Sequence, residues 1–89
     1  MENPFSSLQS QNPISIAQQS VENVHRAVKQ AQSHPSHQTV QNAQNAIEKA
    51  ERSIAQAEGR MNQEPIDRAN ESLEEDRGFL AEVENQLNN

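Results

Sequence analysis

Acidic side chains are the most numerous residues in this chain that could do chemistry, and most of them lie late in the sequence. Eight of the thirteen acidic residues fall from Glu64 onward, where only two arginines oppose them. Four of these glutamates recur at helical spacing on the outward side of a predicted helix: Glu71, Glu74, Glu75 and Glu82. Catalytic carboxylates lie in clefts, whereas the convex side of a helix offers none. We therefore interpret the four glutamates as a candidate interaction face, or as a surface that only keeps the protein solvated.

Asp76 differs from the other acidic residues because it falls among apolar positions. Its neighbours in the helical repeat are Leu73 and Leu80, which are expected to be buried. An acidic residue at such a place can pair with a buried Arg or Lys, specify how helices align, or lie hydrated at an open end. The sequence leaves these three possibilities open. Arg77 and Gly78 follow directly, and Gly lowers helix stability by about 1 kcal/mol, which predicts a local irregularity.

Histidines are the other candidates for chemistry. His34 and His37 form an HxxH pair across a predicted turn, and His25 lies upstream. A zinc site needs a third and a fourth ligand, and no acidic residue lies nearby in the sequence. The chain has no Cys, no Gly-rich phosphate loop and no Ser/His/Asp arrangement. We therefore expect no metal, no cofactor and no enzymatic activity.

Three amphipathic helices are predicted to position these residues. In each of them, apolar residues recur at alternating steps of three and four, which is the a/d repeat of a helix that buries one narrow stripe. We call this stripe the apolar seam of the helix. The three seams are Ile14, Ala17, Val21, Val24, Val28 and Ala31; Val40, Ala43, Ile47, Ala50, Ile54, Ala57 and Met61; and Ile66, Ala69, Leu73, Asp76, Leu80, Val83 and Leu87.

Two breaks in the phase of this repeat separate the helices. The first break coincides with Pro35, which disfavours a helical conformation of the residue before it. The second lies between Met61 and Ile66, after Gly59, a plausible cap. We expect helices over about 13–33, 36–60 and 64–88, preceded by a flexible arm over 1–12. The predicted fold is all-α, an antiparallel up-down-up three-helix bundle over 13–89. The alternative is a long hairpin or open array that closes only in an oligomer.

Composition limits the classes of function. The net charge is −6 and the only aromatic residues are two Phe, so we expect no direct binding of nucleic acid. Apolar runs are short, and the sequence start has no signal-peptide pattern, which predicts a cytoplasmic protein with no membrane span. We expect a non-enzymatic protein that acts in protein–protein interaction or in self-assembly as a homo-oligomer. The alternative is an acidic inhibitor or nucleic-acid mimic that docks on a basic protein surface.

Three segments carry a resemblance to known proteins: VENVHRAVKQAQ, NAIEKAERSIAQAE and FLAEVENQL, arranged between Val21 and Leu87. This arrangement resembles the small uncharacterised, Cys-free helical proteins of Bacillus-type spore-formers. The third segment also looks like the small acid-soluble spore proteins. The resemblance implies a bacterial cytoplasmic or spore-core protein, and it brings no catalytic residues to carry over.

Overall fold

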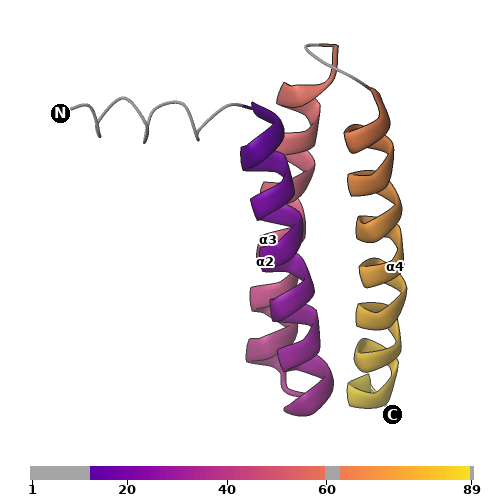
Figure 1. Ribbon diagram of the computed structural model, residues 1–89. Helices are drawn as coiled ribbons and strands as arrows, with labels where there is room; N and C mark the ends of the chain where they lie inside the picture. The colour runs from indigo at the N-terminus through magenta and orange to yellow at the C-terminus, as the bar shows by residue number, and fades with distance from the viewer. Residues whose placement is uncertain (1–12, 60–62, 89) are drawn as a thin grey trace, which may run out of the picture.

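The computed structural model describes residues 13–59 and 63–88, which form three long helices (Figure 1). Helix α2 spans Pro13–Ser33, α3 spans His37–Ala57 and α4 spans Gln63–Asn88. Each helix contacts both others, α2 and α4 run parallel, and α3 runs antiparallel to both. This confirms the predicted all-α, up-down-up three-helix bundle. The arm predicted over 1–12 lies outside the described residues.

The core consists of the three apolar seams, which face one another along the bundle axis. Its buried apolar members are Ala17, Val21, Val24, Val28, Ala31, Val40, Ala43, Ile47, Ala50, Ile54, Ala57, Ile66, Ala69, Leu73, Leu80 and Val83. Ile14 and Leu87 are partly buried at the ends of their seams, and Met61 lies outside the described residues. Because Ala supplies six of the sixteen buried positions, the helices approach closely but bury little apolar area per residue.

A capping box begins α3. The Ser36 hydroxyl accepts a hydrogen bond from the Thr39 backbone N–H at 3.1 Å, and the Ser36 N–H donates to Thr39 Oγ1 at 3.1 Å. Two of the four N–H groups that a helix start leaves unbonded are satisfied in this way. Ser36, which was expected to be the first helical residue, is therefore the cap.

Helix α3 ends at Ala57, earlier than the expected Gly59 or Arg60. The backbone leaves the helical region at Glu58, whose N–H still donates to the Ile54 carbonyl at 3.0 Å. Gly59 follows with a φ of +81°, a left-handed conformation that glycine adopts without steric penalty. The apolar pattern alone places the end too late because Met61 continues it.

The irregularity predicted at Arg77 and Gly78 is wrong, since α4 continues through both residues. Buried residues on either side, including Leu73 and Leu80, hold α4 against the other helices. Helices in proteins owe most of their stability to such packing, which outweighs a penalty of about 1 kcal/mol for one Gly.

Polar contacts along the surface match the antiparallel alignment of α4 on α3. Gln44 Nε2 donates to the Glu84 carboxylate, and seven residues further along α3 Glu51 pairs with Arg77. The contacted residue on α4, Arg77, lies seven residues before Glu84, as expected for antiparallel helices. On the opposite flank of α3, the hydroxyls of Ser20 and Ser53 lie 3.1 Å apart and join it to α2.

Candidate interaction surface

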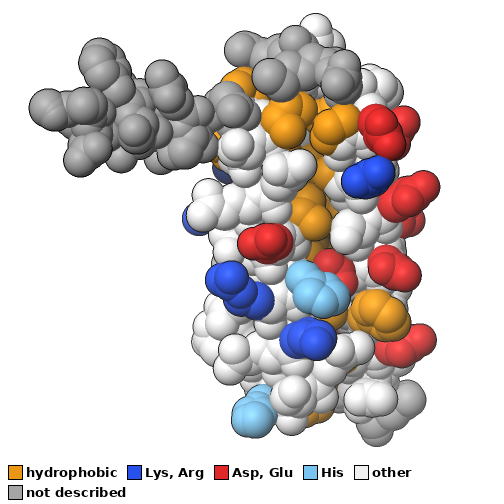
Figure 2. Space-filling model, viewed as in Figure 1, with side chains coloured by type: hydrophobic (Ala, Val, Ile, Leu, Met, Phe, Trp, Pro, Cys, Tyr) orange, Lys and Arg blue, Asp and Glu red, His pale blue; other side chains and the backbone are white. Residues whose placement is uncertain are grey.

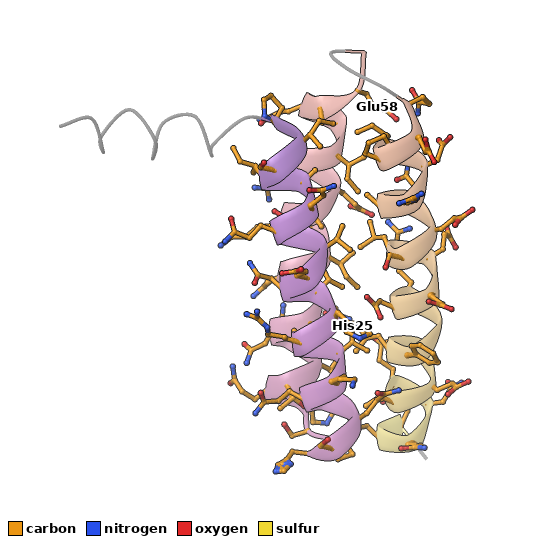
Figure 3. All side chains as sticks on the ribbon, viewed as in Figure 1. His25 and Glu58 are labelled. Atoms are coloured by element: carbon orange, nitrogen blue, oxygen red, sulfur yellow. The ribbon has the colours of Figure 1, made fainter. Side chains whose placement is uncertain are left out.

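Asp76 is the buried charged residue of the described core, with 1% of its surface exposed. It occupies a seam position of α4, so the helix directs its side chain inward, toward α2. There, His25 Nδ1 lies 3.2 Å from Asp76 Oδ1. Figure 3 shows His25 on the side of α2 that faces α4. The two residues meet because α2 and α4 run parallel and begin at the same end of the bundle (Figure 1).

The hydrogen-bonding capacity of the Asp76 carboxylate is only partly used. Its Oδ2 atom is buried and has no hydrogen-bond partner among the described residues. The 3.2 Å contact of Oδ1 is also longer than the 2.7–2.9 Å that is usual between a charged N–H donor and a carboxylate. A buried acceptor without a donor costs about 1–3 kcal/mol. Asp76 is therefore an under-bonded acceptor inside an otherwise apolar seam.

Two of the possibilities left open for Asp76 are wrong. Its partner is His25 rather than Arg or Lys, and the seam is closed at this point rather than open to water. The adjacent Arg77 cannot serve Asp76 because one residue along a helix turns the side chain by about 100°. Arg77 instead faces α3, where it pairs with Glu51, and it also lies 3.5 Å from Glu74 on its own helix.

Between α2 and α4, a pocket opens on one side of Asp76, and an exposed aromatic side chain lies on the other. Toward the start of α4 there is a pocket of about 330 Å³, with apolar walls from Val21, Pro65 and Ala69 and a polar rim from Gln18, Arg68 and Ser72. One turn after Asp76, Phe79 is 39% exposed. Figure 2 shows hydrophobic side chains exposed along this line, with a histidine and an acidic side chain beside each other. We call the pocket, the His25–Asp76 pair and Phe79 together the α2–α4 groove.

The four glutamates singled out from the sequence lie on a different side of α4. Glu71, Glu74, Glu75 and Glu82 are all exposed, and a shallow hollow brings the first three together with Arg68. Glu82 lies outside this hollow, further along the helix. Glu74 has Arg77 as an ion-pair partner, whereas the other three have none among the described residues.

The described residues around Asp76 accept and donate hydrogen bonds, and those on the surface of α4 also form ion pairs. Among residues 13–59 and 63–88, no group of three or more His, Cys, Asp and Glu side chains could hold a metal ion. His34 and His37 lie exposed at the corner between α2 and α3. The His25–Asp76 pair corresponds to two members of a nucleophilic triad, but within the described part no nucleophile is hydrogen-bonded to His25.

His25 is the residue that sequence reasoning missed as the partner of Asp76. A signal for the pairing was present. In an up-down-up bundle the first and third helices run parallel, and His25 lies as far from Pro13 as Asp76 lies from Glu64, the expected start of the third helix. The two side chains are therefore expected at the same level, but only if the fold is assumed first.

Comparisons with protein-family models, curated proteins and solved structures found no match to this chain. The resemblance to proteins of spore-formers accordingly stays a prediction. Within the helices described, none has the length and apolar character needed to cross a membrane. The geometry of the groove is thus the basis for inferring function.

Proposed function

We propose that this chain is a non-enzymatic helical protein that binds a protein partner, or a second copy of itself, through the α2–α4 groove. The observation that supports the proposal is the under-bonded Asp76. A well-packed apolar side chain at this position would continue the seam of α4 and would stabilise the bundle as well as or better than a buried carboxylate. A buried acceptor one turn from a pocket has a use when a partner supplies the missing donor.

Phe79 adds to this support. Exposed aromatic side chains near a pocket commonly act as anchors in protein interfaces, because they bury a large area with few rotatable bonds. Phe79 is the exposed large hydrophobic residue of the described chain, and it lies one turn from Asp76. The unbonded oxygen of Asp76 and the exposed ring of Phe79 therefore occur within one turn of the same helix.

The proposal is tested by affinity capture from a lysate of the source organism, combined with light scattering of the purified protein. The baits are the wild type, Phe79→Ser and, as a matched surface control, Glu82→Gln. We expect a partner, or a dimer in light scattering, that Phe79→Ser loses and Glu82→Gln keeps. If the wild type stays monomeric and captures nothing that depends on Phe79, the proposal is wrong.

A second candidate function is an acidic inhibitor or nucleic-acid mimic, supported by Glu71, Glu75 and Glu82. These carboxylates are exposed on one helix and have no ion-pair partner in the described structure, so they can occupy a basic groove of another protein. Exposed charges are screened by salt. Capture by this route should therefore decline steeply as salt is raised, whereas capture through the α2–α4 groove should not. Both candidates assume a cytoplasmic protein, as the resemblance implies.

A further inference from the structure

We propose that the partner is an amphipathic helix of another protein that carries one Lys or Arg on its apolar side, and that it lies in the α2–α4 groove as a fourth helix with this cation against Asp76. The inference rests on the proposed function and names the chemistry of the partner. Three observations determine it: the unbonded oxygen of Asp76, the spacing of the apolar sites around it, and the charge of α4.

The cation site is the Asp76 carboxylate. Its Oδ2 atom is unbonded, and a Lys or Arg donor would form a charge-assisted bond shorter than the 3.2 Å contact that His25 makes to Oδ1. Because 55% of the His25 side chain is exposed, its ring can turn toward solvent and give access to the carboxylate. Binding of the cation therefore requires the His25 ring to turn away from Asp76.

The apolar sites indicate that the partner is a helix. Val21 in the pocket lies four residues before His25 on α2, and Ser72 at the pocket rim lies four residues before Asp76 on α4. Phe79 lies three residues after Asp76. The pocket, the carboxylate and the aromatic ring therefore follow one another at intervals of one helical turn. A helix laid along the groove matches them with an apolar residue, a cation and an apolar residue at i, i+4 and i+7.

Charge favours a cationic partner over a second copy. From Glu64 onward the chain has eight acidic residues and two arginines, both of which already pair with glutamates of this chain. A second copy docked on α4 would bring like charges together. Lys29 is exposed on α2 one turn beyond His25, and its positive charge would repel the cation of the partner helix. Lys29→Gln is accordingly expected to tighten binding.

The test uses three synthetic helices of about 20 residues, long enough to be helical in water. The first, built on Ala and Gln, has Leu, Lys and Leu at i, i+4 and i+7. The second has the same composition with Lys on the opposite face, and the third has norleucine in place of Lys. Binding to the full chain is measured by fluorescence anisotropy at about 0.15 M salt. We expect the first peptide to bind at least about tenfold more tightly than either of the others.

Two matched variants of the protein locate the site. Asp76→Asn and Glu82→Gln each remove one negative charge, the first from the groove and the second from the exposed side of α4. We expect Asp76→Asn to weaken binding of the first peptide by about tenfold, and Glu82→Gln by less than about twofold. Phe79→Ala, at an exposed position, provides a third variant that folds independently of the buried pair and is also expected to weaken binding.

Equal binding of the on-face and off-face peptides, or equal losses in Asp76→Asn and Glu82→Gln, would overturn the inference, because general attraction to an acidic protein would then explain the binding. If none of the peptides binds while the full chain captures a partner in a Phe79-dependent way, the cationic helix is wrong and the proposed function stands. If Phe79→Ser also leaves capture unchanged, the proposed function fails as well.

Discussion

Asp76 places a carboxylate in a seam whose other buried members on α4 are apolar. The neighbouring seam members Leu73 and Leu80 are almost fully buried, and Asp76 is as buried as they are. Moving a charge out of water is unfavourable unless hydrogen bonds replace its hydration, and here one oxygen of two is bonded. At the scale of the residue, the pair with His25 therefore reduces a penalty without removing it.

Asp76→Leu and Asp76→Ala are expected to raise the free energy of unfolding, or to leave it unchanged. Both substitutions remove the unbonded oxygen, and Leu also continues the apolar seam, for a gain of about 1–3 kcal/mol. The measurement is urea denaturation followed by circular dichroism. His25→Ala serves as the comparison: it leaves the carboxylate buried without a donor and should lower the free energy of unfolding by about 1–3 kcal/mol. A loss of stability in both Asp76 variants would show that the carboxylate is fully bonded.

At the scale of the element, Gly59 and Gly78 have different backbone conformations, since Gly59 follows the end of α3 and Gly78 lies within α4. Substitution by Ala should therefore affect stability differently at the two positions. Gly78 lies inside α4, where an added Cβ would meet no atom within 4 Å. Gly78→Ala should therefore stabilise the protein by about 1 kcal/mol, the difference in helix propensity. Gly59 has a φ of +81°, so Gly59→Ala should destabilise it by about 1–2 kcal/mol. Thermal melts of the two single variants should shift in opposite directions, and shifts of the same sign would contradict this assignment.

The sequence predicts the helices well because the apolar residues repeat with the period of a helix and few of them lie elsewhere. The phase break at Pro35 locates the first corner for the same reason, whereas the break between Met61 and Ile66 falls several residues after the end of α3. The end of α3 is less predictable, since an apolar residue can continue the pattern beyond the last helical turn. The partner of Asp76 is a tertiary contact between α2 and α4, and no local pattern in either helix specifies it.

At the scale of the whole molecule, the Ala-rich core leaves the single bundle with modest stability, whereas the acidic α4 disfavours pairing with a second copy through that helix. Six buried alanines limit the apolar area that stabilises the fold, while the excess of carboxylates on α4 repels another copy there. We expect the midpoint of thermal unfolding to stay constant over about a hundredfold range of protein concentration. A midpoint that rises with concentration would support self-assembly instead of a separate partner.

A variant with Lys in place of Glu71, Glu74, Glu75 and Glu82 tests whether the partner binds the α2–α4 groove or the glutamate face of α4. Each reversal adds two charges, so the net charge changes from −6 to +2. All four side chains are exposed and outside the core, and the one ion pair that is lost, Glu74–Arg77, has an N–O distance of 3.5 Å. Exposed ion pairs contribute about 0–1 kcal/mol, so the variant should keep its helical circular dichroism and unfold cooperatively.

The binding behaviour of this variant then distinguishes the functions. If the α2–α4 groove binds the partner, the variant should keep the partner that the wild type captures, with at most a modest loss because long-range attraction to a cation is weakened. If the protein imitates a nucleic acid, the same variant should lose its partner completely, since a basic groove repels the new lysines. Unfolding of the variant would contradict both expectations, because it would require these glutamates to stabilise the bundle itself. We expect binding to be retained, since Asp76 and Phe79, which form the groove with the pocket beside them, are unchanged.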